Sequence, residues 1–344
     1  LGITVPLLQA PMAGATTPVL AAAVSNAGAL GGHGCAALSV EAVANHIQEI
    51  RRHTSGPFNL NFFCHDPTPL DNQQAQQWIE HFRPLFTELN APTPNTLTAG
   101  YTSLNHNPAM VELLLKEKPA VLSFHFGVPT PEMVRAFKAR GIILLGCATR
   151  LSEAEVIAHA GLDGIIVQGK EAGGHQGVFD RSATVFEPLL ELLPRIQQQV
   201  SLPLIAAGGI MTGEHIARVM QAGACAAQLG TAFLLCPETQ VSPSHRQALQ
   251  QKTGEETALM SEISGRPARG FIHPLHQKLS PHKAQLPAYP YPYSITKALI
   301  QAARAQQNNH YDVHWAGTGV GKIREMKAQA LVATLEAERQ AALR

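Results

Sequence analysis

The chain has 344 residues, of which 45% are hydrophobic and 15% charged, and 26 basic against 25 acidic residues give a net charge of +1. This balance argues against nucleic-acid binding, which requires a basic surface, and against a highly charged disordered chain. No apolar stretch approaches the ~18 residues that cross a bilayer. The five cysteines lack the spacing of a zinc or disulfide framework. We therefore expect a cytoplasmic protein with free thiols, no metal, and no nucleic-acid or membrane partner.

Eight short apolar runs punctuate the first two thirds of the chain. They are continuously apolar rather than alternating, which is typical of parallel strands buried on both faces. The runs lie at Pro6–Met12, Leu30–His33, Phe58–Phe63, Ala120–Phe126, Ile142–Ala148, Gly164–Gln168, Pro203–Ala207 and Ala226–Gly230. Asn95–Tyr101 is a further extended candidate.

Helix-like segments separate the strands. Those with the clearest pattern are Pro18–Ala27, Ser39–His53, Glu132–Arg140, Ser152–Ala160 and Gly213–Ala222. Ser39 and Ser152 are expected N-caps. Glycines are expected to end four of the helices, at Gly28, Gly141, Gly161 and Gly223. The alternation predicts an α/β fold, a (β/α)8 TIM-like barrel, with a doubly wound open sheet as the alternative.

The pattern changes after Cys236. Val241–Leu259 reads as a helix, Gly265–Pro292 as an irregular, proline-rich stretch, and Thr296–Gln306 and Lys322–Arg344 as two more helices. We predict a barrel domain of residues 1–236, completed by residues 310–344. Residues 237–309 are predicted to form a smaller, mainly helical C-terminal cap domain over the barrel mouth.

Glycines end the last two predicted strands, where barrels commonly bind phosphate. Gly208 and Gly209 precede a predicted helix, whose N-terminal dipole favours an anion. Gly230 and Thr231 offer further backbone N–H groups and a hydroxyl. Glycines also end many strands without binding anything, but the two pairs together favour a phosphate ligand.

His175 is the best candidate for a general base, because it follows two glycines in "EAGGH" and its ordinary pKa lies near neutrality. Gln168 ends the same strand with an amide that suits a heterocycle edge. His125 ends one apolar strand, and Asn61 is a polar residue inside another. Each is either a site residue that faces the barrel mouth or a core group whose hydrogen bonds are satisfied within the protein. Three tyrosines in the run "YPYPY" from Tyr289 are followed by Lys297. This segment is either one wall of a pocket for an anionic substrate or a proline-rich linker on the surface.

Six segments together carry a family resemblance. They are "QAPMAGATTP" from Gln9, "FNLNFFCH" from Phe58, "VLSFHFG" from Val121, "QGKEAGGHQGVF" from Gln168, "PLIAAGGIM" from Pro203 and "QLGTAFLLCPE" from Gln228. With the tyrosine–lysine segment and "WAG" at Trp315, this set resembles the class I nitronate monooxygenases, formerly called 2-nitropropane dioxygenases, over nearly the whole chain. "AGALGGHG" departs from the pattern at Ala29 and His33, and His33 near the flavin would bear on substrate range.

The resemblance implies FMN as the cofactor and a role for each matched residue. His175 is the implied catalytic base. The implied FMN contacts are Gln9, Ala10, Pro11, Met12, Asn61, Gln168, Gly173, Gly208, Gly209, Gln228, Gly230 and Thr231. The implied substrate contacts are Tyr101, His125, Tyr289, Tyr293 and Lys297.

The implied reaction is the oxidative denitrification of alkyl nitronates, propionate 3-nitronate above all, by O2 in a detoxifying monooxygenase. One electron passes from the nitronate through a flavin semiquinone to O2, and a carbonyl compound and nitrite or nitrate result. Lys297 and protonated His175 are expected to attract the anion, and the enzyme to be a monomer or homodimer. The alternatives are an FMN-dependent NAD(P)H:quinone or enoyl reductase, or a non-catalytic phosphate-ligand protein.

Overall fold

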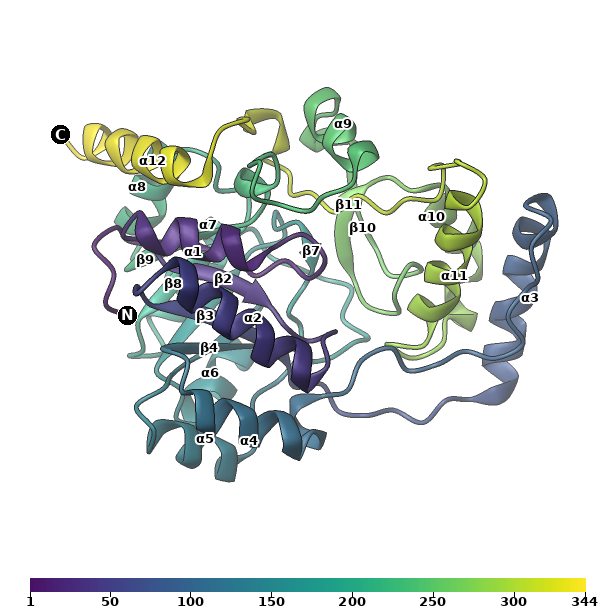
Figure 1. The fold of residues 1–344 in the computed structure, drawn as a ribbon, viewed down its shortest axis with the longest axis horizontal. Helices are drawn as coiled ribbons and strands as arrows, with labels where there is room; N and C mark the ends of the chain where they lie inside the picture. Colours follow the sequence, from purple (N-terminus) through teal and green to yellow (C-terminus); the bar gives the residue numbers. More distant parts are fainter.

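Eight parallel strands form the larger of the two sheets in the computed structural model, which describes residues 1–344 (Figure 1). The order is β1-β9-β8-β6-β5-β4-β3-β2. A parallel bridge between Leu8 and Leu30 joins the two edge strands, so the sheet closes into a barrel. Its strands are β1 (Leu7–Gln9), β2 (Gly31–Gly34), β3 (Phe58–Phe63), β4 (Val121–His125), β5 (Ile143–Ala148), β6 (Gly164–Gln168), β8 (Leu204–Ala207) and β9 (Ala226–Leu229).

Eight helices surround this barrel, and all but the C-terminal one connect successive strands, as a TIM-like barrel requires. They are α1 (Pro18–Asn26), α2 (Val40–His53), α4 (Pro108–Glu117), α5 (Pro131–Lys138), α6 (Leu151–His159), α7 (Leu189–Gln197), α8 (Gly213–Gln221) and α12 (Ala328–Ala342). The C-terminal α12 lies against α8 (Figure 1), and its Glu338 carboxylate accepts a 2.8 Å hydrogen bond from the N–H of Gly213. The predicted barrel fold and all eight predicted strands are confirmed.

Local sequence explains most helix ends. Ser39 caps α2 by accepting a hydrogen bond from the N–H of Ala42. Ser152 was expected to cap in the same way, and this is wrong: it lies inside α6, whose first residue is Leu151. The four predicted helix-ending glycines adopt φ between +75° and +107°, a region in which an L side chain is strained.

The core has two layers around the sheet. Inside the barrel, apolar side chains such as Leu8, Val121, Ile166 and Ile205 fill the interior. Outside it, the helices cover the opposite strand faces with fully buried residues such as Phe124 and Leu335. Burial on both faces is the reason that the strands read as continuous apolar runs.

A second hydrophobic cluster lies to one side of the barrel (Figure 1). It joins the later helices to α3 (Asn72–Glu88), whose Trp78 and Phe82 are completely buried there. The other helices of this cluster are α10 (Pro274–Leu279) and α11 (Pro292–Arg304), whereas α9 (Pro243–Gln251) packs into a separate small cluster through Ala248 and Leu249. A segment from between two barrel strands therefore shares a core with the region predicted to be the cap.

The chain between Cys236 and Pro292 is more regular than its sequence suggested. The predicted helix Val241–Leu259 is cut short, because β10 (Thr257–Met260) follows a 3-10 turn at Gly254–Glu256. The stretch predicted to be irregular contains β11 (Ala268–Phe271), α10 and the 3-10 segment Ser280–Gln285. Asn95–Tyr101 forms no strand, and the last helix begins at Ala328 rather than near Lys322.

The smaller sheet connects the two parts of the chain. Its order is β10-β11-β7, and β7 (Gly174–His175) belongs to the loop after barrel strand β6. Ala268 of β11 pairs with His175, and Arg269 pairs with Gly174. The remaining 3-10 segments are Leu104–His106, Thr231–Phe233 and Val320–Lys322. None of the helices combines the length and apolar character needed to cross a bilayer.

Candidate active site

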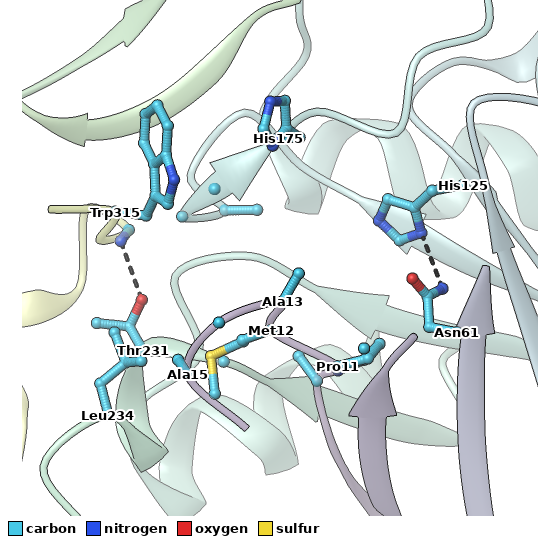
Figure 2. A pocket seen from close by; sticks show the side chains of 18 of the residues that line it. Pro11, Met12, Ala13, Ala15, Asn61, His125, His175, Thr231, Leu234 and Trp315 are labelled. Carbon is cyan, nitrogen blue, oxygen red and sulfur yellow. Dashed lines mark hydrogen bonds between the residues drawn. The ribbon is translucent and has the colours of Figure 1, made fainter. Parts of the chain in front are cut away.

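A cavity of about 410 Å³ opens at the carboxyl ends of the barrel strands, the end at which TIM barrels place their active sites. Figure 2 shows Pro11, Met12 and Ala13 on one side of it, opposite His175 and Trp315. Sixteen of the eighteen residues predicted from the sequence line this cavity: Ala10, Pro11, Met12, Asn61, Tyr101, His125, Gln168, Gly173, His175, Gly208, Gly209, Gln228, Gly230, Thr231, Tyr289 and Tyr293.

One end of the cavity presents backbone N–H groups that have no partner in the protein. The N–H groups of Gly209, Gly230 and Thr231 donate no hydrogen bond to any other residue. Gly208 and Gly209 adopt φ of +120° and +69°, which only glycine tolerates easily. The Thr231 hydroxyl accepts a 3.0 Å hydrogen bond from the N–H of Gly317 (Figure 2). This end is built to receive an anion such as a phosphate.

Buried amides line the middle of the cavity. The Oε1 of Gln228 is buried and has no hydrogen-bond partner, so it is free to accept a hydrogen bond from a ligand. Asn61 donates to the Oγ of Ser123 at 3.0 Å, and its Nδ2 lies 3.5 Å from the Nδ1 of His125 (Figure 2). Gln168 braces the next loop, since it accepts from the N–H of Gly177 at 2.7 Å.

His175 is held from both sides. Its backbone pairs with β11, and its Nε2 lies 2.8 Å from the Oγ of Ser264. The single hydroxyl proton of Ser264 is directed at the carbonyl of Arg266, 3.2 Å away. When the hydroxyl proton of Ser264 lies on that carbonyl, Ser264 accepts from the Nε2–H of His175 and the imidazole lone pair is on Nδ1.

Burial, together with the nearby Arg266 cation and His125, lowers the pKa of His175 to about 3. His175 is therefore neutral at neutral pH, and the expectation that a protonated His175 attracts an anion is wrong. Burial also lowers the pKa of His125 to about 4. The neutral form is the one that a general base requires, whereas a pKa this far below neutrality makes the imidazole a weak base.

Three tyrosines form an aromatic wall at the other end. The Tyr101 ring is stacked on that of Tyr289, with centroids 6.0 Å apart, and is tilted by 32° against the Tyr293 ring, 6.1 Å away. Lys297 does not line the cavity: its Nζ lies 3.2 Å from the Tyr101 hydroxyl and 4.6 Å from the Tyr293 ring centroid, on the solvent side. Burial among these rings lowers its pKa, although the side chain stays partly exposed.

Two other residues lie away from the place expected for them. Gln9 is buried within the barrel wall, where its Oε1 accepts a 2.9 Å hydrogen bond from the N–H of Gly32. His33 points toward α2, and its Nε2 lies 2.8 Å from the Nδ1 of His46. The alternation of side chains along β2 turns His33 away from the cavity, so a direct effect on substrate range is not supported.

Sequence reasoning missed several residues that complete the site. Ser264 and Arg266 reach His175 and the wall from the loop between β10 and β11, and nothing in the local pattern marks that loop as close to the barrel. Trp315 lines the cavity with its ring 5.6 Å from His175. The "WAG" motif at Trp315 contributed to the family resemblance, but no site role was predicted for Trp315 from it.

The family model for nitronate monooxygenase matches residues 1–338. A nitronate monooxygenase of Pseudomonas aeruginosa is 43% identical over 340 residues, covering 98% of this chain and 97% of that protein. A nitronate monooxygenase of Paraburkholderia phytofirmans is 44% identical, covering 98% of this chain and 93% of that protein.

Solved structures agree with this relationship. The nitroalkane oxidase of Streptomyces ansochromogenes superposes with a TM-score of 0.91 at 34% identity, covering 99% of this chain and 97% of its own. FabK from Thermotoga maritima superposes with a TM-score of 0.75 at 25% identity, covering 99% of this chain and 94% of the FabK chain. The chain therefore belongs to the nitronate monooxygenase family, a class of flavin-dependent oxidoreductases, and is an enzyme that acts on a small molecule.

Proposed function

We propose that this enzyme uses FMN and O2 to denitrify alkyl nitronates oxidatively, with propionate 3-nitronate as the leading substrate. One observation carries the proposal: the unpaired N–H groups of Gly209, Gly230 and Thr231 share a cavity with His175 and the tyrosine wall. The unpaired N–H groups suit the phosphate of a cofactor. His175 and the tyrosine wall suit a small substrate that lies between that cofactor and a base.

The residues that line the cavity fit both the phosphate and the flavin ring of FMN. The glycine N–H groups and the Thr231 hydroxyl would hold the phosphate. The buried, unpartnered Oε1 of Gln228 would accept a hydrogen bond from the flavin ring, and Met12 and Pro11 would lie against its face. When bound, FMN supplies one-electron chemistry between the nitronate and O2, from which the carbonyl product and nitrite or nitrate follow.

The protein's own contribution is binding and proton transfer. A nitronate already lacks its α-proton and needs only to be bound, oriented and shielded from water by the tyrosine wall. A neutral nitroalkane must first lose that proton, and the Nδ1 lone pair of His175 would accept it. Ser264 holds the imidazole in the tautomer that this step needs.

The broader organisation of the enzyme belongs to the same proposal. Residues 237–309 would form a cap over the barrel that residues 1–236 and 310–344 build, in a cytoplasmic monomer or homodimer. The small sheet supports this division, because it places the loop carrying His175 against that region.

Two measurements on the purified protein test the proposed function. Its visible absorption spectrum should show bound oxidised flavin, released as FMN on denaturation. Oxygen uptake should follow addition of propionate 3-nitronate or an alkyl nitronate, with nitrite or nitrate as product. A colourless protein that takes up no FMN, or rapid anaerobic bleaching by NADH without nitronate turnover, would replace the proposal with a binding protein or a reductase.

A further inference from the structure

Arg266 is a buried cation without an acidic partner. Only 5% of the Arg266 surface is exposed to solvent. The Nη1 of Arg266 donates a 2.6 Å hydrogen bond to the carbonyl of Val178, and its Nε is buried with no hydrogen-bond partner. No carboxylate lies within ion-pair distance of it. Burying an unpaired charge is costly, so such a group is most easily explained by a negative charge that arrives with a ligand.

The position of this cation points to the ligand. The guanidinium carbon lies 4.4 Å from the ring centroid of Phe126 and 5.2 Å from that of Tyr289. Both rings pack edge-on against His175, with centroids 5.9 and 6.2 Å from it, and Tyr289 lines the cavity. Arg266 does not line the cavity itself, so it faces the substrate compartment through one aromatic layer.

None of the other groups around this layer pairs with the charge, although Asp180 and Glu153 are close enough to raise the pKa of Arg266 against the effect of burial. Burial keeps His65, His125 and His175 neutral, and the Arg266 cation lowers the pKa of His65 and His175 further. The Glu153 carboxylate accepts hydrogen bonds from the N–H groups of Thr149 and Phe179 instead. The remaining charged or titratable neighbours are Asp180, Arg181 and Tyr289.

We propose that Arg266 is a specificity-determining residue whose positive charge, acting through the Phe126–Tyr289 layer, selects anionic substrates over neutral molecules of the same shape. This inference rests on the proposed function and assigns to Arg266 the role that the sequence had suggested for Lys297 and a protonated His175. The same charge adds to burial in lowering the pKa of His175, so it also weakens the imidazole as a proton acceptor.

The expected size of the effect follows from the distance. A ligand in contact with the far face of Tyr289 lies roughly 9 Å from the guanidinium carbon, since van der Waals contact adds about 3.5 Å. At that distance and an effective dielectric constant of about 20, one charge changes anion affinity on the order of 20-fold.

Binding without turnover gives the most direct test. Isobutyrate has the shape and charge of the nitronate of 2-nitropropane, and isobutyramide is its neutral counterpart. Calorimetric titration of the purified protein should show Arg266→Met weakening isobutyrate binding about 10-fold or more, with isobutyramide binding unchanged. Arg266→Lys should retain most of the anion affinity. The control Arg181→Gln removes an exposed charge nearby and should change neither affinity by more than about twofold.

Steady-state kinetics supply an independent readout. Arg266→Met should raise KM for an alkyl nitronate with little loss of kcat, and should shift the pH profile of nitroalkane turnover upward as the pKa of His175 rises. Equal losses for isobutyrate and isobutyramide, or no loss for either, would overturn the role given to Arg266. If wild type binds isobutyrate preferentially and Arg266→Met abolishes that preference, but nitronates are not consumed, the proposed reaction fails and the role of Arg266 stands.

Discussion

Three local features orient the His175 side chain. The preceding glycine, Gly174, has φ of +73°, β11 pairs with the backbone of His175, and the Oγ of Ser264 lies 2.8 Å from its Nε2. The "EAGGH" motif was enough to identify the residue, but not its partners. The protonation state depends on Arg266 and on burial, neither of which is visible in the motif.

His175→Asn tests the separation of binding from proton transfer. Asparagine keeps a polar side chain of similar reach but has no basic lone pair at neutral pH. We expect FMN binding and most nitronate turnover to remain, and nitroalkane turnover to fall by about 10²-fold or more. Parallel assays with 2-nitropropane and its nitronate measure this, and unchanged nitroalkane kinetics would remove His175 from the role of base.

Gly209→Ala tests the phosphate end. Gly209 has φ of +69°, and an added Cβ would lie 3.1 Å from the Cβ of Glu171. Gly141→Ala is a matched control, because Gly141 has φ of +75°, ends α5 and has open space around its Cβ position. Both substitutions should cost roughly 1–2 kcal/mol of stability. Only Gly209→Ala should raise the Kd for FMN, measured by flavin fluorescence, and equal FMN affinity in the two variants would contradict the phosphate assignment.

At the scale of elements, the eight strands follow from continuous apolar runs, whereas the second cluster does not. No helix was predicted around Trp78 and Phe82, and only the folded chain brings α3 against α11. The strands β10 and β11 were missed because neighbouring prolines and glycines indicate loops, and their pairing with β7 is a contact between segments far apart in sequence.

Ser39 and Ser152 allow helix capping to be tested within one chain. Ser39 accepts the N–H of Ala42 at 3.1 Å, whereas Ser152 is an exposed residue within α6. Ser39→Ala should lower the free energy of unfolding by about 1 kcal/mol, and Ser152→Ala should change it by less than about 0.5 kcal/mol. Urea unfolding of both variants measures the difference, and equal effects would show that the Ser39 cap contributes nothing.

At the scale of the whole molecule, six histidines make stability dependent on pH. Burial lowers the pKa of His175 to about 3 and that of five others to about 4: His33, His65, His125, His245 and His273. Their ordinary value in an unfolded chain lies near 6.5. The unfolded chain therefore binds more protons than the folded one between about pH 6.5 and 4.

Stability should be fully present above about pH 7.5, one unit above the ordinary pKa, and should fall as the pH decreases through 6.5 toward 4. Each histidine contributes a slope of up to about 1.4 kcal/mol per pH unit. Thermal unfolding at pH 8.5, 7.5, 6.5, 5.5 and 4.5 should show Tm nearly constant between the first two values, lower at pH 6.5, where half of the unfolded-state imidazoles are protonated, and declining steeply below. A Tm that does not change down to pH 4.5 would mean that these imidazoles are solvated rather than buried.

The sequence by itself determined the barrel, the glycine-rich strand ends and the presence of His175 at the cavity, because each depends on residues close together in the chain. Burial on both faces imposes apolar runs, and tight turns at strand ends impose glycine. Only the tertiary structure decided which groups surround the substrate compartment. Ser264, Arg266 and Trp315 meet His175 because β7 pairs with β11 and the chain folds back over the barrel mouth. Tertiary packing also turned His33 outward and set the charge state of His175, since burial depends on segments distant in sequence.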